Sequence, residues 1–490
     1  MFAKPLLAAL LACALAAAQA APSTNPWASM TRADVEFVYH SIQDNHPGAI
    51  DPANPYFKDW LERGYAQALV DADKASSLAD LRNVLQRYFA GFADGHLSID
   101  FSYRPRTVRW SGMILAREGE RYRIVYRDTR IAADVDANAE LIACDGRPID
   151  AIIKEDLIPR ALNNPQLEWL RGALANSVMV IDDGLPHPAY ASCTIADQRG
   201  RRDIALHWAN TAREAFRAAW DLGVPDMDNK ATITEISAGN FWVRLPEFAP
   251  NADQVTQLKQ LTARMPQLRN AALVVFDIRG NHGGDSQWGA DVLAALFGEP
   301  YMQQLMGQKS HGHAEWRISK GNLSYLEQDI LPRSQRQFGP DSDNAKRWAD
   351  LARRMAEALA RKETLINQTA IKEAASAPPA AAPLSQAKVA LVTDYGCASS
   401  CLDFADKVLA LPGAVHLGQT TAADTVYMEV RGLPLPSGLG RFVVSQKVYR
   451  GRARGHNEPY VPKAKFDGPI SDTPRVQAWV MQQLAMPARP

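Results

Sequence analysis

The sequence has 490 residues, which is too long for one compact core and predicts about three domains. Hydrophobic residues make up 47% and charged residues 22%, as is ordinary for a soluble globular protein. The 54 lysines and arginines balance the 54 aspartates and glutamates, and this neutrality argues against a general nucleic-acid binder, which needs a basic surplus. No internal apolar run is long enough to predict a transmembrane helix. The composition therefore favours a multidomain enzyme.

Residues 1–20 have the pattern of a secretory signal peptide. Lys4 provides the positive start and Leu6–Ala18 the apolar stretch, and a small-residue site predicts cleavage after Ala20. Alternatively, the residues up to Cys13 resemble a lipid-attachment box, but that would leave a very short apolar region. The sequence thus predicts a periplasmic or secreted bacterial protein.

Removal of this segment leaves Cys144, Cys193, Cys397 and Cys401. An oxidising compartment permits two disulfides among four cysteines, but the sequence leaves the pairing open. Cys397 and Cys401 are spaced by one helical turn, which puts their Cα atoms about 6 Å apart, within reach of a disulfide. Two buried thiols are the alternative explanation, and no cysteine spacing is typical of a metal site.

The first part of the chain has helical periodicity. Apolar residues recur near the 3.6-residue period between Leu78 and Phe89, and Ser77 with Asp80 predicts the start of that helix. Residues 107–208 instead predict strands, with a turn at Asp145–Gly146.

Continuous apolar runs predict a buried parallel sheet further along the chain. The first run, from Leu273, is followed by a predicted helix over Trp288–Phe297. The second, Val389–Thr393, is followed by a predicted helix over Ser399–Leu409, and a third strand starts near Ala414. Repeated strand, turn and helix are typical of a layered α/β core.

The predicted organisation follows from these patterns. It consists of a signal peptide (1–20), an N-terminal helical domain that carries the expected base (21–104), a β-rich module (105–210), the first part of the α/β core (225–299), a mostly helical insertion ending in an Ala/Pro-rich linker (300–384), and the second part of the core with the nucleophile (385–490).

Two turns at the ends of the core strands are candidates for chemistry. The turn Gly396–Cys401 places hydroxyl groups where a strand meets a helix with free amides, as a serine nucleophile and its oxyanion require. Taken alone, a serine that merely caps the helix is the more ordinary explanation. The pair Gly283–Gly284 offers amides without side-chain obstruction, although a tight turn is the ordinary explanation there as well.

A serine nucleophile also needs a base. His96, between a predicted helix and a predicted strand, is the first candidate, and His282 beside the glycine pair is its rival. His311 and His313 could suggest a metal, but no third ligand has a recognisable spacing. We therefore expect no metal and no organic cofactor.

These stretches, in this order, resemble the S41 family of serine peptidases, which includes the tail-specific and the tricorn-core peptidases. The matching segments are 92–98, 275–284 and 389–401, and 417–422 is similar to a further conserved turn of the family. The most specific is Asp-Ile-Arg-Gly-Asn-His-Gly-Gly at 277–284. The resemblance covers roughly residues 30–100 and 235–475.

The resemblance implies that Ser399 is the nucleophile. It also implies that the oxyanion hole consists of the amide of Ser400 and that of either Gly283 or Gly284. A disulfide between Cys397 and Cys401 would then fix the turn that bears the nucleophile.

The expected base differs between the branches of the family. The processing-protease branch uses a lysine, but residues 422–424 contain none. The tricorn-like branch uses a histidine, which falls on His96, although the serine that precedes it in that branch is replaced by Gly95. The glutamate of that branch falls on Glu458, and Asp424 is the second candidate.

The resemblance further implies a crotonase/ClpP-like α/β core and a degenerate PDZ-type module over residues 107–208, for which a plain β cap is the alternative. We expect a serine peptidase that hydrolyses polypeptides through an acyl-enzyme, without a nucleic-acid partner or a membrane span. A non-catalytic peptide- or ligand-binding protein with this fold and a serine esterase or amidase are the alternatives. The sequence leaves the cleavage preference and the oligomeric state open.

Overall fold

The computed structural model describes residues 25–182, 185–224, 227–309, 312–369 and 381–485. The predicted signal peptide and most of the predicted Ala/Pro-rich linker lie outside the described residues. Within these residues no helix is both long enough and apolar enough to cross a membrane.

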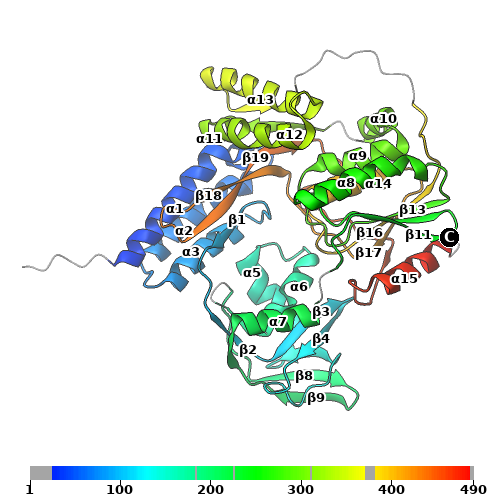
Figure 1. The fold of residues 1–490 in the computed structure, drawn as a ribbon. Helices are drawn as coiled ribbons and strands as arrows, with labels where there is room; N and C mark the ends of the chain where they lie inside the picture. Colours follow the sequence, from blue (N-terminus) through cyan, green and yellow to red (C-terminus); the bar gives the residue numbers. More distant parts are fainter. Residues whose placement is uncertain (1–24, 183–184, 225–226, 310–311, 370–380, 486–490) are drawn as a thin grey trace, which may run out of the picture.

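A six-stranded sheet forms the centre of the α/β core, in the order β11-β12-β13-β16-β17-β20 (Figure 1). β11 pairs antiparallel with β12, and all other neighbours are parallel. The predicted core strands are confirmed as β13, β16 and β17, and their apolar runs are buried because helices cover both faces of the sheet. The strands span β11 (Thr232–Ser237), β12 (Asn240–Arg244), β13 (Leu273–Asp277), β16 (Lys388–Thr393), β17 (Val415–Gly418) and β20 (Ala464–Lys465).

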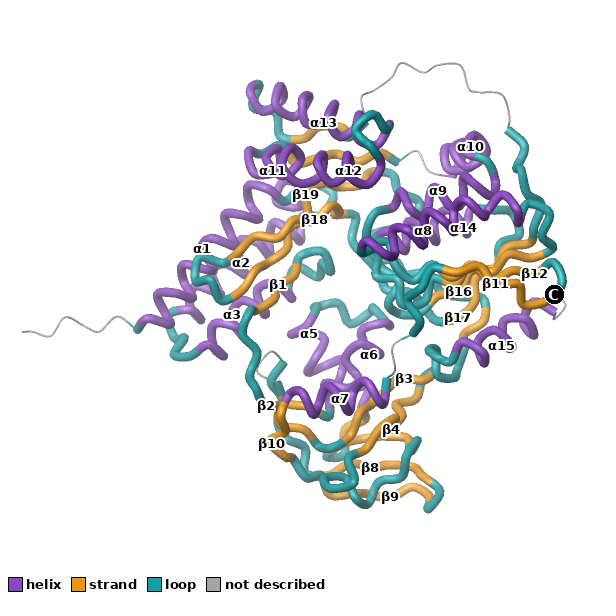
Figure 2. Tube along the Cα trace, viewed as in Figure 1, coloured by secondary structure: helices purple, strands orange, loops and turns teal. Residues whose placement is uncertain are grey.

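Helices lie on both faces of this sheet, as Figure 2 shows. One face packs against α8 (Ala252–Arg264), α9 (Ser286–Phe297) and α14 (Ser400–Ala410), with α10 (Glu299–Lys309) beside them. α15 (Thr473–Ala485) covers the other face. The predicted helices after the first two core strands are confirmed as α9 and α14, so both turns that the sequence selected lie at the same edge of the sheet.

A buried ion cluster fixes the end of β13. The Asp277 carboxylate accepts hydrogen bonds from Arg279 at 2.7 and 2.8 Å and from Nη1 of Arg244 at 3.2 Å. Asp277 and Arg279 are fully buried. Burial acts to raise the pKa of Asp277, but the two guanidinium groups outweigh it and hold that pKa below its usual value.

Replacing Asp277 by asparagine should lower the free energy of unfolding by about 3–5 kcal/mol, because Arg279 would be left buried without its counter-charge. Since the folded-state pKa of Asp277 is lowered, this contribution exists above the unfolded pKa of about 4 and is lost as pH falls below it. Urea unfolding at pH 7 measures the difference in the free energy of unfolding between the wild type and the Asp277→Asn variant. Asp253→Asn on the exposed first turn of α8 is the control, expected within about 0.5 kcal/mol of wild type. Equal losses of unfolding free energy in both variants would contradict the role of Asp277 as the counter-charge of Arg279.

The N-terminal helices α1 (Pro26–Asn45), α2 (Pro55–Ala72) and α3 (Leu78–Ala90) pack against a second sheet. This sheet pairs β1 (Ser98–Phe101) with β19 (Gly440–Arg450), which also pairs with β18 (Tyr427–Pro434). The predicted start of α3 is confirmed, since the Ser77 side chain accepts a hydrogen bond from the amide of Asp80. The N-terminal region is thus completed by strands from residues 385–490, which the sequence assigned entirely to the core.

The insertion is mostly helical, as predicted for residues 300–373, but it also contains two short strands. It contains β14 (His313–Arg317) and β15 (Leu365–Asn367), and β14 pairs antiparallel with β19. Between them lie α11 (Lys320–Tyr325), α12 (Leu331–Phe338) and α13 (Asp343–Ala360). Only Ala314 and Trp316 alternate as buried residues, and this is too short a pattern to indicate a strand. The pairing anchors the helices to the N-terminal sheet.

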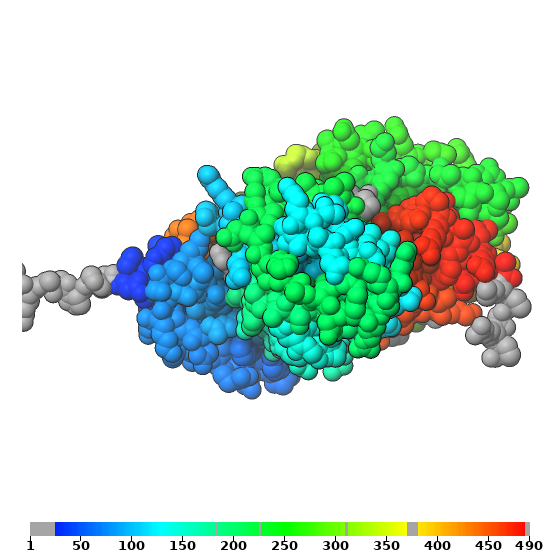
Figure 3. Space-filling view, turned by 90° about the horizontal axis from the view of Figure 1, so that it is seen from below, coloured from blue at the N-terminus to red at the C-terminus, as the bar shows by residue number. Residues whose placement is uncertain are grey.

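The β module lies between the N-terminal helices and the C-terminal segment (Figure 3). The prediction of strands throughout is wrong for residues 149–178, where α4 (Ile149–Ile152), α5 (Ile158–Ala161) and α6 (Trp169–Leu174) occur. The isoleucines of this stretch favour strands locally, but the helices bury them against the sheet. The module contains two sheets. The main sheet consists of β3 (Met113–Glu118), β4 (Arg121–Arg127), β5 (Glu140–Cys144), β6 (Arg147–Pro148), β8 (Ser192–Asp197) and β9 (Gly200–Ala205). The smaller sheet consists of β2 (Thr107–Trp110), β7 (Val180–Ile181) and β10 (Ala209–Ala212), and α7 (Arg213–Gly223) lies beside it.

The turn predicted at Asp145–Gly146 is confirmed, and both residues have positive φ. Cys144 and Cys193 lie opposite each other on β5 and β8 and form a disulfide. The remaining two cysteines, Cys397 and Cys401, form the second disulfide. The pairing that the sequence left open is therefore assigned.

Candidate active site

Ser399 occupies an exceptional backbone position between β16 and α14. Its φ of 55° and ψ of −127° are rarely adopted by residues other than glycine. Its side chain makes no capping hydrogen bond to α14, unlike the serines that cap α3, α11 and α13. Ser399 therefore does not have the ordinary role of a helix cap.

A buried carboxylate joins the two turns of the sheet edge. Asp394 accepts a hydrogen bond from the amide of Gly280 at 2.8 Å and from the amide of Gly396 at 3.0 Å. Burial is the main cause that raises the pKa of this carboxyl. The bonds hold the turn after β13 against the turn that bears Ser399.

Gly283 lies directly against Ser399. A Cβ atom at Gly283 would be 2.7 Å from the Cβ of Ser399 and 2.8 Å from the carbonyl oxygen of Ala398. The Gly283 amide donates to Oδ1 of Asn281 at 2.9 Å, so it is already in use. Gly284 and Ser400 line the same cavity as Ser399, so their amides are the candidates for an oxyanion pair.

Ser399 and His96 line the same cavity, of about 1020 Å³. Its walls come from parts of the chain far apart in sequence: the N-terminal turn, the core edge, the insertion helices and the strands β18 and β19. Its lining includes His96, Gly284, Asp285, Ser399, Ser400, Asp403, Glu429, Lys447 and Tyr449. The proposed nucleophile and the proposed base thus line one cavity.

The His96 side chain has a buried ring nitrogen that forms no hydrogen bond to the described residues. Its backbone amide donates to Oδ1 of Asp94 at 2.9 Å, but its Nδ1 is buried and has no hydrogen-bond partner among the described residues. The rival base, His282, is exposed, is absent from the cavity lining, and has Nδ1 3.0 Å from the carbonyl oxygen of Gly396. Of the two histidines, only His96 lines the cavity together with Ser399.

The two acids proposed to orient His96 have other partners. Glu458 is exposed and accepts a hydrogen bond from the amide of Gly455 at 2.6 Å. Asp424 is buried, and its Oδ1 forms ion pairs with Arg452 at 3.3 Å and with Arg454, while its buried Oδ2 has no hydrogen-bond partner among the described residues. In the described part of the chain no hydrogen bond or ion pair joins either carboxylate to the His96 side chain.

Lys447 is a cavity residue that the sequence did not reveal. Its Nζ donates to Glu429 and Gln368, each at 3.2 Å. Burial acts to lower the pKa of Lys447, but Tyr449 and the acids Glu429 and Asp403 outweigh it and raise that pKa above its usual value. A raised pKa favours the charged ammonium, which speaks against Lys447 as the base for Ser399. A lone lysine within a strand carries no local signal for this position.

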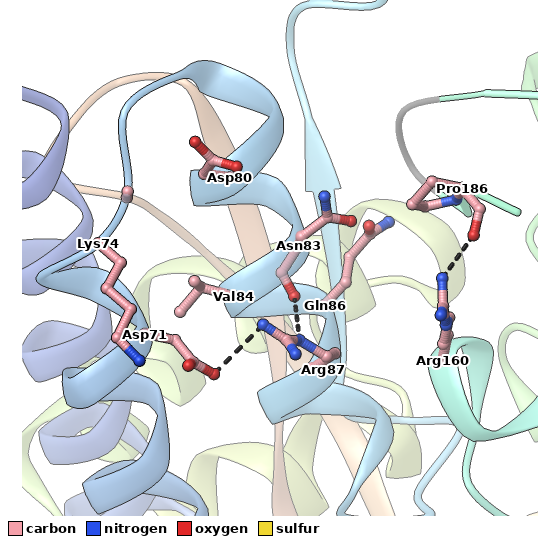
Figure 4. A pocket seen from close by; sticks show the side chains of 10 residues that line it. Asp71, Lys74, Asp80, Asn83, Val84, Gln86, Arg87, Arg160 and Pro186 are labelled. Atoms are coloured by element: carbon pink, nitrogen blue, oxygen red, sulfur yellow. Dashed lines mark hydrogen bonds and ion pairs between the residues drawn. The ribbon is translucent and has the colours of Figure 1, made fainter.

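A second cavity of about 360 Å³ lies between α2, α3 and α5 (Figure 4). Arg87 there contacts Asp71 at 3.2 Å, and Arg160 donates to the carbonyl oxygen of Pro186. Its lining contains no serine, cysteine or histidine, so it offers no nucleophile. His313 is 3.5 Å from Glu315, His311 lies outside the described residues, and no three potential metal ligands come together in the described ranges.

The comparisons with known proteins agree with this geometry. The pattern of peptidase family S41 matches residues 242–461, which include both turns. A search of the curated proteins finds no match. The structure of mature CPAF in complex with lactacystin is similar with a TM-score of 0.63 and 12% identity, over 93% of this chain and 98% of that chain. Mature CPAF alone gives the same TM-score and identity, over 93% and 97%. The tricorn protease matches with a TM-score of 0.38 and 13% identity, over 93% and 36%.

The similarity to CPAF establishes the fold, a mixed α/β structure with a helical N-terminal region and several sheets. The family pattern covers β12 to the residues after β19 and therefore contains Ser399, Gly283 and Gly284. Residues 242–461 of the chain therefore form a region of the peptidase family S41 type, and S41 is a family of serine peptidases.

Proposed function

We propose that this protein is a periplasmic or secreted serine peptidase that uses Ser399 as nucleophile and His96 as base. The observation that carries the proposal is the strained Ser399, whose hydroxyl caps no helix and which lines one cavity with His96. A backbone strain of this kind persists where the surrounding fold enforces it, as at catalytic turns.

In the proposed reaction, Oγ of Ser399 bonds to the carbonyl carbon of a peptide while its proton passes to Nε2 of His96. The electron pair of the carbonyl moves to its oxygen, which the amides of Gly284 and Ser400 hold. The C–N bond then breaks, and the amine leaves with the proton from His96. Water attacks the acyl-enzyme by the same proton route, releasing the carboxylic acid and Ser399.

The protonated Lys447 supports a Ser–His rather than a Ser–Lys arrangement. Its ammonium is held by Glu429 and Gln368 and has a raised pKa, so it is an acid near neutral pH and not a base. For the residue that orients His96, we keep Glu458 and Asp424 from the family resemblance. Glu458 binds the amide of Gly455, whereas Asp424 has one buried oxygen, Oδ2, without a hydrogen-bond partner among the described residues.

The proposed compartment is supported by the cysteines. Both disulfides use all four cysteines that follow the predicted signal peptide, and such bonds persist mainly in oxidising compartments. For the core we propose the crotonase/ClpP-like arrangement, which agrees with a parallel sheet covered by α8, α9 and α14 on one face. For the β module we propose a PDZ-like role in gripping polypeptide substrates, supported by its place between the N-terminal helices and the core.

Removing the Cys397–Cys401 disulfide should lower kcat/KM by about 10- to 100-fold, because the bond closes the turn around Ser399 and small displacements of a nucleophile are costly. The double variant Cys397→Ser/Cys401→Ser tests this with peptide substrates. The matched comparison is Cys144→Ser/Cys193→Ser, which removes the disulfide of the β module and should lower the melting temperature while lowering kcat/KM less than the first variant does. Unchanged activity of the first variant would contradict the role of this bond.

Substrate turnover distinguishes a serine peptidase from an esterase or amidase and from a non-catalytic binding protein. The mature protein should hydrolyse a library of fluorogenic peptides with a kcat/KM that exceeds its value for short p-nitrophenyl esters. Faster turnover of the esters, with no peptide cleaved, would support an esterase. Peptide binding without any hydrolysis would support a non-catalytic binding protein.

A further inference from the structure

The cavity that contains Ser399 lies between two parts of the molecule with separate hydrophobic clusters. His96 directly precedes Leu97, which belongs to the cluster of the N-terminal helices and β19. Ser399 lies two residues before Cys401, which belongs to the cluster of the α/β core. The insertion helices α11, α12 and α13 supply a further wall of the same cavity. The position of the insertion therefore decides how a polypeptide reaches Ser399.

One side of the insertion is attached firmly to the N-terminal part. β14 pairs with β19 over four residues of each strand. At the start of α11, Oγ of Ser319 donates to Oδ1 of Asn45 at 2.7 Å, and Nδ2 of Asn322 donates to the carbonyl oxygen of Asn45 at 3.0 Å. Asn322 is fully buried, and the insertion also has a hydrophobic cluster of its own. Its helices thus hold together and stay attached to the N-terminal part without help from the core.

The opposite side of the insertion reaches the α/β core through weaker hydrogen bonds. Asn344 and Arg347 on α13 both donate to Oε1 of Gln287, at 3.5 and 3.4 Å. Nζ of Lys259 donates to the carbonyl oxygen of Gln337 at 3.4 Å. All three distances exceed the usual range of about 2.7–3.2 Å, so each bond contributes little.

Phe338, at the end of α12, provides the apolar contact on this side. Its ring centroid lies 5.4 Å from that of Trp288, which is 3% exposed. Phe338 itself is partly buried, and in the described range 312–369 no other residue packs against the hydrophobic cluster of the core. The attachment to the core thus depends on one aromatic side chain and three long hydrogen bonds.

The two attachments restrict how a substrate enters the cavity. Because the insertion contacts both parts, a polypeptide reaches Ser399 either by threading one end beneath the helices or after the weaker attachment has released. The cavity of about 1020 Å³ holds a stretch of chain but no folded domain, since a domain of 100 residues has a radius of gyration of about 13 Å. A polypeptide with a folded domain at each end can therefore be cleaved only when the insertion opens.

We propose that α11, α12 and α13 form a lid over Ser399, which is hinged on β14, latched to the core by Phe338, and opens on its core side to admit an internal segment of a polypeptide. This inference rests on the proposed function, because the lid has a role only if Ser399 acts on polypeptides. Opening breaks the contacts of Phe338 and Gln287, while the strand pairing and the bonds to Asn45 are kept. Lids of this kind let substrate in and then exclude water from the reaction.

A substrate with two folded domains tests the lid. It carries a cleavable peptide sequence between two stable domains, so that neither end can thread, and the free peptide is the reference. Lys259→Cys/Gln337→Cys places two thiols across the attachment to the core. Because the four cysteines of the mature protein are bound in disulfides, a short bismaleimide joins only the new pair. Cross-linking should lower kcat/KM at least about 20-fold for the two-domain substrate and less than about 3-fold for the free peptide.

The matched control is Arg353→Cys/Glu357→Cys, whose thiols lie one turn apart on the exposed face of α13. Cross-linking this pair does not span the cavity, so both substrates should be cleaved as by the wild type.

Removing the latch should have the opposite effect to cross-linking. Phe338→Ala should raise kcat/KM for the two-domain substrate about 3- to 10-fold and leave the value for the free peptide unchanged, because only the former requires an open lid. If this variant does not fold, the cross-linked pair decides.

Two results would overturn the lid. The first is a wild-type protein that cleaves the free peptide but not the two-domain substrate, since the insertion would then never open. The second is a cross-linked Lys259→Cys/Gln337→Cys protein that keeps wild-type activity towards both substrates or loses both activities equally. Failure of the proposed function is distinct, because the wild-type protein would then cleave neither substrate.

Discussion

Replacing Ser399 by alanine should reduce peptide hydrolysis by about 10⁴- to 10⁶-fold, the largest effect expected from any single change. The reason is chemical, because without Oγ no acyl-enzyme forms and only the oxyanion donors and substrate binding remain. The Ser399 side chain caps no helix, so its removal should leave the fold intact. Alanine keeps the Cβ atom that the backbone with φ of 55° already accommodates, so the substitution should not change the conformation of this turn.

The measurement is kcat/KM with the best fluorogenic peptide, together with the melting temperature of each protein. Ser237→Ala, at an exposed position on β11, is the control and should keep wild-type activity. An active Ser399→Ala protein with an unchanged melting temperature would place the nucleophile elsewhere.

Replacing Gly283 by alanine should lower kcat by about 100- to 1000-fold, as expected when an oxyanion site is disturbed. The added Cβ would be 2.7 Å from the Cβ of Ser399 and 2.8 Å from the Ala398 carbonyl oxygen, closer than real Cβ contacts. One of the two turns must then shift. The φ of 103° at Gly283 adds strain for any residue with a side chain.

The variant Gly413→Ala distinguishes the two causes of this loss of kcat, which are the contact of the added Cβ with Ser399 and the backbone strain at positive φ. Gly413 also has a positive φ, of 72°, but a Cβ there would meet nothing within 4 Å. This variant should therefore share the backbone strain, lose some stability and keep its kcat. Comparable losses of kcat in both variants would mean that proximity to Ser399 is not what makes Gly283 necessary.

The parts of the fold that local sequence predicts are those whose patterns are continuous. β13 and β16 are apolar runs buried on both faces, and each is followed by a turn and an amphipathic helix, so the sheet edge with Ser399 and Gly283 was predicted from the residues themselves. The spacing of Cys397 and Cys401 allowed a disulfide but left two buried thiols as the alternative, and the structure has the disulfide.

The parts of the fold and of the candidate site that the sequence did not predict depend on contacts between segments far apart in the chain. β1 pairs with β19 although more than three hundred residues separate Ser98 from its partner Val443, and no local pattern encodes such pairing. The Cys144–Cys193 disulfide required the register of β5 against β8. Lys447 in the cavity wall is a single polar residue whose surroundings exist only after these strands have paired.

Active-site labelling with a fluorophosphonate tests the central claim most directly. We expect the mature wild-type protein to be labelled at Ser399, and we expect labelling to be lost in both Ser399→Ala and His96→Ala while both variants remain folded. Labelling that is absent from the folded wild-type protein would contradict a serine peptidase and favour a binding protein. Labelling that is lost only in Ser399→Ala would contradict His96 as the base.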